Sequence, residues 1–207
     1  MRALFQSLFF SFCRPFDFAS YIGGWNSIPL EEKNRWHSLG IRPLDLSEAI
    51  AMSWIFKIIS SILMLVILNL GEFFTFVHPL LKFHLPTHSL IIFIGCSTAF
   101  YPLKTILTVI LWKWAVRVFG LLYMDDEEIE KHLNDILAHS LSSNVLLAVP
   151  FVGPIFQEIL WPFYLFAGLK NTYRLGPFQA MSIFSLFFFF SLLLLLALFM
   201  ATISILF

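Results

Sequence analysis

The C-terminal part of the sequence lacks charge altogether. No Asp, Glu, Lys or Arg occurs from Leu175 to Phe207, and residues 183–207 are almost wholly Phe, Leu, Ile, Met, Ala and Ser. A hydrocarbon layer of about 30 Å needs roughly 20 apolar residues at about 1.5 Å rise each, and this stretch exceeds that length. The absence of charge excludes a water-exposed helix here and predicts a transmembrane one.

Charge is also scarce in the chain as a whole. Charged residues make up 13% of the 207 residues, whereas 59% are hydrophobic and 26 are Phe. An average globular domain carries about 25% charged residues. Lys and Arg (13) balance Asp and Glu (13), so the chain lacks the basic excess of a nucleic-acid-binding protein. We expect a polytopic membrane protein that has the lipid bilayer as a partner and does not bind nucleic acid.

Cysteine and catalytic motifs are nearly absent. The two cysteines, Cys13 and Cys96, are too few for a disulfide framework. The sequence has no glycine-rich phosphate loop, no His-Glu-x-x-His, no Gly-x-Ser-x-Gly and no paired intramembrane acids. We therefore predict no catalytic residue, no cofactor-binding residue and no enzymatic activity.

Three histidines that lie near one another raise the question of a metal site. Two prolines between them prevent a shared helical face, and no Cys or carboxylate lies close in sequence, so no metal-binding residue is predicted. The histidines are His78, His84 and His88, and the prolines are Pro79 and Pro86.

The apolar runs predict an all-α fold, a bundle of four transmembrane helices. An interfacial or cytoplasmic segment over residues 1–48 precedes the bundle, which occupies residues 49–207. The predicted spans are about residues 49–77, 88–112, 146–169 and 178–207.

The second apolar run leaves five spans open as an alternative. It extends to Tyr123 and is interrupted by Pro102, so the chain could break there and cross twice. That arrangement would bury Lys113 and Arg117 near mid-membrane, at roughly 2.5–3.5 kcal/mol each, which favours four spans. In both arrangements most Lys and Arg lie on the side of the N-terminus, so we expect the N-terminus to be cytoplasmic.

One segment, about residues 125–141, has the pattern of a helix at a water boundary. Asp125 can cap the helix with Glu128 three residues later, and acidic residues crowd the first turn, where the helix dipole favours them. The apolar positions recur at helical spacing. They are Ile129, Leu133, Ile136, Leu137 and Leu141. We predict an amphipathic cytoplasmic helix that rests on the bilayer or on the bundle.

Glu158 is an ionisable residue in the middle of the third predicted span. A carboxylate at that depth needs a partner or water. Lys104, the basic residue flanked by apolar sequence within the second span, is the candidate partner. An ion pair that fixes helix register is the main interpretation, and a proton or ion site is the alternative.

The same predicted span contains helix-breaking residues. Pro150, Gly153, Pro154 and Pro162 interrupt its backbone, and in hydrocarbon the freed carbonyls must be satisfied by protein or water. A kinked packing helix, in which Gly153 allows a close approach, is the main interpretation. Broken helices also build transport sites, so a small transporter or channel subunit is the alternative function.

The region from Leu137 to Ala180 holds a series of motifs: a Pro-x-x-Gly break, an aromatic pair, a Gly-Leu-Lys sequence and an Ala near the start of the next predicted helix. The residues are Pro150 and Gly153, Trp161 and Tyr164, Gly168, Leu169 and Lys170, and Ala180. This series resembles the core of bacterial Yip1-domain membrane proteins, in which a polar helix leads to the same succession of motifs. The earlier run Arg14-Pro15-Phe16-Asp17-Phe18 also looks like such proteins.

This resemblance implies a function without chemistry. Eukaryotic Yip1 relatives are multispanning factors in vesicle trafficking that bind small GTPases, whereas bacterial members largely lack an assigned activity. We expect a non-enzymatic scaffold in the bacterial inner membrane that contacts itself or other membrane proteins.

Overall fold

The computed structural model describes residues 2–23, 34, 36, 38, 41–69 and 87–206, and every regular element in these ranges is helical. This confirms the predicted all-α class. The helices are α1 (Arg2–Cys13), α2 (Pro15–Gly23), α4 (Leu46–Asn69), α6 (Thr87–Gly120), α7 (Asp126–Ser140), the 3-10 helix η1 (Leu141–Ala148), α8 (Gly153–Thr172) and α9 (Pro177–Leu206).

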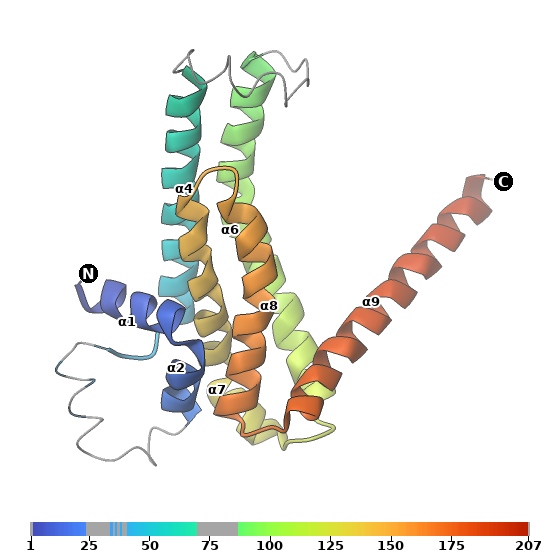
Figure 1. Cartoon of the computed structure of the whole chain (residues 1–207). Helices are drawn as coiled ribbons and strands as arrows, with labels where there is room; N and C mark the ends of the chain where they lie inside the picture. The colour runs from blue at the N-terminus through green and yellow to red at the C-terminus, as the bar shows by residue number, and fades with distance from the viewer. Residues whose placement is uncertain are drawn as a thin grey trace.

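Helices α4 and α6 form a long antiparallel pair that the other helices surround at one end (Figure 1). Within the described residues, Leu46–Ile67 and Ile91–Gly120 are the two helical segments long and apolar enough to cross a membrane. Most of their side chains point away from the rest of the protein. They correspond to the first two predicted spans and indicate a membrane-associated protein. In α9, the described apolar part Pro177–Leu193 is shorter than a span.

Helix α6 passes through Pro102 without a break. It is continuous from Thr87 to Gly120, so the break considered for a five-span arrangement does not occur there. Proline lacks an N–H and frees the carbonyl four residues earlier, here that of Thr98. The indole N–H of Trp54 on α4 donates to this carbonyl at 3.1 Å. The hydroxyl of Thr98 also lies 2.6 Å from that of Ser61 on α4. Pro102 therefore does not break α6, and the carbonyl that it leaves free forms a hydrogen bond between α6 and α4.

The third predicted span, residues 146–169, is divided in the structure. Its first residues belong to η1, the chain reverses over residues 149–152, and a separate helix, α8, begins at Gly153. Helices α7 and η1 run up from the end of the bundle where α6 ends, and α8 runs back to that end (Figure 1). We call this end the lower end, and α7, η1 and α8 together the hairpin. The sequence pattern shows the breaking residues but does not show that they reverse the chain.

Helix α7 matches the predicted amphipathic helix. Its first turn carries Asp126, Glu127 and Glu128, and its apolar stripe is buried. From Ile136 onward every side chain of α7 is buried, because the hairpin partner α8 and helices α2 and α4 surround it. The helix therefore begins in a polar setting and ends in the protein interior.

Helix α2 covers the lower half of α8, and α1 packs on α2 and η1. The Thr172 hydroxyl donates to the Ala19 carbonyl at 3.0 Å, and the Asn171 amide donates to the Phe16 carbonyl at 2.9 Å. Gly23 lies so close to α8 that an added Cβ would be 2.3 Å from the Thr172 carbonyl oxygen. The described part of the predicted segment 1–48 is thus packed against the bundle.

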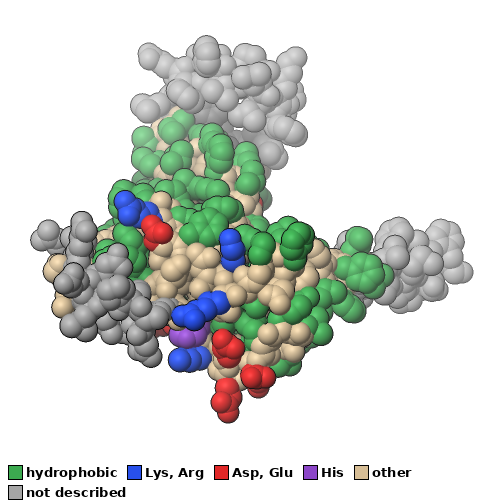
Figure 2. Space-filling model, turned by 60° about the horizontal axis from the view of Figure 1, so that its bottom comes forward, with side chains coloured by type: hydrophobic (Ala, Val, Ile, Leu, Met, Phe, Trp, Pro, Cys, Tyr) green, Lys and Arg blue, Asp and Glu red, His purple; other side chains and the backbone are tan. Residues whose placement is uncertain are grey.

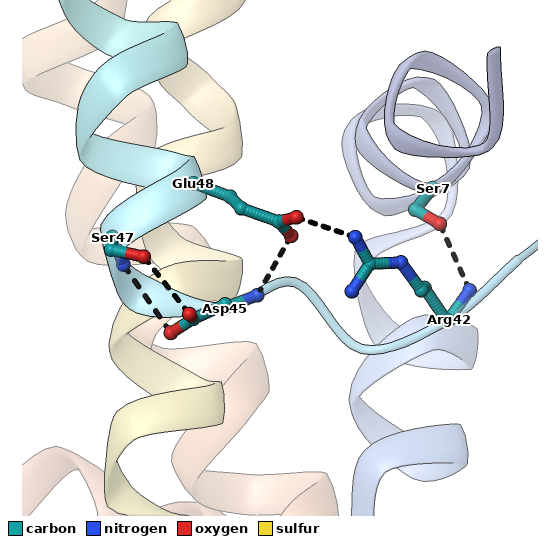
Figure 3. A network of polar contacts seen from close by, with 5 residues as sticks. All are labelled: Ser7, Arg42, Asp45, Ser47 and Glu48. Carbon is teal, nitrogen blue, oxygen red and sulfur yellow. Dashed lines mark hydrogen bonds and ion pairs between the residues drawn. The ribbon is translucent and has the colours of Figure 1, made fainter. Parts of the chain in front are cut away.

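A polar network fixes the start of α4 (Figure 3). Asp45 precedes the helix and accepts hydrogen bonds from the hydroxyl and N–H of Ser47, while Glu48 accepts from the Asp45 N–H at 3.4 Å. These reciprocal bonds satisfy N–H groups that the first turn of a helix leaves open. Arg42 forms an ion pair with Glu48, and its N–H donates to Ser7 of α1 at 2.9 Å. The network therefore links α1 to α4.

Two predicted features lie outside the described residues. They are the end of the first predicted span, residues 70–77, and the part of the following loop that holds His78 and His84.

Replacing Trp54 with Phe removes the N–H that serves the Thr98 carbonyl. We expect the free energy of unfolding to fall by about 1–3 kcal/mol, because a carbonyl within an apolar helix is left without its donor. In a Pro102→Ala background the N–H of residue 102 can bond this carbonyl, so the same replacement should cost less. Thermal unfolding in detergent of the wild type, Trp54→Phe, Pro102→Ala and the double variant measures how much stability Trp54→Phe costs in each background. An equal loss in both backgrounds would contradict this role of Trp54.

Candidate functional site

The two ionisable residues singled out within the predicted spans lie against each other. Lys104 of α6 and Glu158 of α8 form an ion pair with 2.7 Å between Nζ and Oε1. Their side chains are 62% and 61% exposed. The pair joins α8 of the hairpin to α6 at the outer surface of the bundle.

A third charge lies close to this pair. Lys57 of α4 is within electrostatic reach of Lys104, and Tyr101, one turn before Lys104, is within reach of Glu158. Two lysines and one glutamate leave one excess positive charge when all three are ionised. The charges come from three different helices, part-way along α4, α6 and α8, so they connect the long helix pair to the hairpin.

Three of the four predicted helix-breaking residues gather at the tip of the hairpin, whereas Pro162 lies inside α8. An added Cβ on Gly153 would lie 1.9 Å from the carbonyl oxygen of Leu146, so only glycine fits there. Phe151 has a φ of 64°, a left-handed conformation that allows the chain to reverse. Pro150 and Pro154 flank this turn. The residues predicted to kink a span therefore build a tight turn between two packed helices.

Below the tip lies a buried polar cluster that the sequence reasoning missed. His139 Nδ1 is hydrogen-bonded to the Ser11 hydroxyl of α1, and the Asn144 amide donates to the Ser53 hydroxyl of α4 at 2.7 Å. All four side chains are at most 1% exposed. The run His-Ser-Leu-Ser-Ser-Asn directly after the amphipathic stripe is the signal that could have revealed the cluster.

Some atoms of this cluster lack partners. His139 Nε2, the Ser142 hydroxyl and the Asn144 carbonyl oxygen have no hydrogen bond within the described part of the chain. Hydrogen-bonded Ser and His side chains are a common nucleophile and base. Here both Ser11 and His139 are fully enclosed, so their bond holds α1 against the hairpin instead of presenting a nucleophile.

Burial determines the protonation state of His139. Removal from water lowers the pKa of His139 from 6.5 to about 3, and the nearby Pro15 backbone opposes this effect only in part. The imidazole is therefore neutral at physiological pH, which suits a ring that packs against Phe18 and Tyr164.

The charged side chains collect at the lower end of the bundle. Figure 2, with that end turned forward, shows acidic and basic side chains gathered there and hydrophobic ones above. Arg117 of α6 pairs with Asp126 at 3.0 Å and with Glu130 at 3.1 Å. Lys113 donates to the Asn134 amide oxygen at 3.4 Å. These two cations thus bind α7 to the end of α6.

The described ranges contain no group of three or more His, Cys, Asp or Glu side chains that could hold a metal ion. Comparison of the chain with protein families, with curated proteins and with solved structures finds no match.

Replacing Glu158 with Gln leaves Lys104 charged without its partner. We expect this variant to lose more stability than the double variant Lys104→Met/Glu158→Gln, because an unpaired charge facing lipid is costly and a neutral pair is not. The coupling energy, calculated from the wild type, Lys104→Met, Glu158→Gln and the double variant, should be about 0.5–3 kcal/mol. Thermal unfolding in lipid nanodiscs measures it. Strictly additive effects would mean that the pair does not stabilise the bundle.

His139 should make the stability of the protein fall at acidic pH. The unfolded chain takes up a proton below about pH 6.5, whereas the folded protein keeps His139 neutral until about pH 3. The free energy of unfolding therefore has its full value above about pH 6.5 and decreases as the pH falls, by about 2 kcal/mol between pH 7.5 and pH 5. Chemical unfolding at both pH values should show a smaller loss for His139→Asn than for the wild type. The same loss in both proteins would contradict the burial of His139.

Proposed function

We propose that this protein is a multi-pass integral membrane protein of the Yip1 type and acts as a non-enzymatic scaffold. One observation carries the proposal: three polar contacts away from the lower end join helices to one another. Lys104 forms an ion pair with Glu158, His139 is hydrogen-bonded to Ser11, and the Trp54 N–H donates to the Thr98 carbonyl. Most of the outward surface of α4 and α6 is apolar. Such a molecule acts through the contacts that it offers to neighbours in the membrane.

The proposed location is the bacterial inner membrane, with the N-terminus and the charged lower end on the cytoplasmic side. The resemblance of residues 137–180 to bacterial Yip1-domain proteins supports this location, and the positive-inside rule supports the orientation. Helices α4, α6 and α9 are the proposed crossings. The four-span arrangement predicted from the sequence also counts α8.

Helix α9 offers the proposed contact surface. It packs on the bundle through its first turns, where Phe187 lies 4.3 Å from Trp112 between ring centroids, and then runs away from the other helices (Figure 1). Beyond that contact, Phe189 and Leu192 are 56% and 65% exposed. Successive residues of a helix point about 100° apart, so the exposed side chains of α9 must meet lipid or a second protein.

Replacing Phe189 and Leu192 with Ala should weaken self-association. We expect light scattering in a mild detergent to show an oligomer for the wild type and a smaller species for the double variant. Phe178→Ala is the control, because this side chain is 90% exposed but lies at the opposite end of α9. An unchanged oligomer in the double variant would count against this surface.

A small transporter or channel subunit is the second candidate function. The grouping of Lys57, Lys104 and Glu158 on three helices favours it, since charges within a membrane often mark an ion pathway. Ion flux into proteoliposomes separates the two proposals. A scaffold gives no flux in either the wild type or Glu158→Gln, whereas flux that Glu158→Gln abolishes would support the transporter.

A further inference from the structure

The tip of the hairpin is an exposed apolar surface. No charged residue occurs from Leu141 to Gln157, and Glu158 is paired with Lys104. Six large apolar side chains at the tip are 42–64% exposed. They are Val149, Phe151, Val152, Ile155, Phe156 and Ile159. In water such a contiguous surface would be costly to leave uncovered.

The backbone of the tip is arranged for surroundings without water. The N–H groups of Val149, Val152 and Gly153 donate to carbonyls within the turn at 2.7–3.0 Å. Pro150 and Pro154 have no N–H to satisfy. A loop in hydrocarbon is tolerated only when its polar groups find partners inside the protein. A loop in water has no such requirement, so these three internal hydrogen bonds favour lipid as the occupant of this surface.

The length of the exposed part is about half a membrane. Helix α2, together with the end of α1, covers α8 from its C-terminal end up to Phe163: the Tyr164 hydroxyl donates to the Phe12 carbonyl, and the Phe163 ring packs on Phe16. The part of α8 beyond these contacts runs from Gly153 to Pro162, which at about 1.5 Å per residue is about 15 Å. The hydrocarbon core is about 30 Å thick. The tip can therefore enter the membrane but cannot cross it.

Both ends of the hairpin lie at the charged lower end. Helix α7 begins with Asp126, Glu127 and Glu128, and α8 is followed by Arg174. Figures 1 and 2 show these ends together on the side where the charged residues gather. The two ends of this helix pair lie on the same side of the protein, and its tip is apolar. This arrangement is typical of a segment that enters a membrane and leaves it on the side from which it entered.

We infer that α7, η1 and α8 form a re-entrant hairpin, whose tip contacts the lipid acyl chains of the leaflet next to the lower end and returns without crossing. This inference rests on the proposed function, because it requires a protein that is embedded in the membrane. It assigns a lipid-binding surface to residues 149–159. It places the start of α7 and the start of α9 on the same side, and it replaces the third predicted span with a half-crossing.

Single cysteines in the full-length protein test the inference. Cys13 and Cys96 are first replaced with Ser and Ala, and cysteine is then introduced singly at Glu127, Phe156 or Phe178, all of which are exposed. The probe is a membrane-impermeant maleimide, applied to sealed vesicles of either orientation. We expect cysteines at positions 127 and 178 to react from one and the same side. We expect the cysteine at position 156 to react from neither side and to match the cysteine-free background.

Three results would overturn the inference. Reaction of position 156 from the far side means a full crossing, and its reaction from the near side means a tip in water. Reaction of positions 127 and 178 from opposite sides means that α8 is a single span. Ile155→Cys, at a side chain 63% exposed, repeats the tip measurement if Phe156→Cys does not fold.

A separate control distinguishes this inference from the proposed function. Washing the vesicles with alkaline carbonate releases proteins that are not embedded in the bilayer. Release of the wild type would contradict the proposed membrane function itself. Retention of the protein together with a labelled tip would contradict only the re-entrant hairpin.

Discussion

The structure depends on one constraint, that a polar group facing hydrocarbon must find its partner within the protein. The clearest case is the Thr98 carbonyl, which Pro102 deprives of its helical donor and which Trp54 of the neighbouring helix satisfies. Without that donor, a proline in the middle of a long apolar helix would expose a carbonyl to lipid, at a cost of several kcal/mol. The need for a partner thus holds α4 and α6 in register.

The same constraint explains how the hairpin is attached. Its polar side chains each reach a different neighbour: His139 reaches α1, Asn144 reaches α4, and Glu158 reaches α6. Because these bonds lead to three separate helices, they specify one position for the hairpin, which apolar contacts alone would leave less defined. At the lower end, where water is available, the ion pairs of Arg117 with Asp126 and Glu130 are exposed and add little by comparison.

The sequence alone reveals features that local rules control. Long apolar runs predict the α class and the first two long helices, and the acidic first turn with its apolar stripe predicts α7. Asp125 lies at the predicted N-cap position, but its side chain makes no capping hydrogen bond. The pairing of Lys104 with Glu158 could be anticipated because each lacked any other partner in its apolar run. The reversal at residues 149–152 could not be predicted, since proline and glycine indicate a break but not the direction in which the chain continues. The His139–Ser11 bond was also missed, because its two residues are 128 positions apart and neither is unusual in its local sequence.

Hydrogen–deuterium exchange of the wild-type protein in lipid nanodiscs tests the central claim most directly. If polar groups are satisfied within the protein and the rest faces lipid, amides of α4, α6 and the hairpin tip should exchange slowly, and those in the first turn of α7 should exchange fast. Fast exchange around Pro150 to Glu158, at the rate of the first turn of α7, would mean that water reaches the tip and the ion pair. That result would contradict the account.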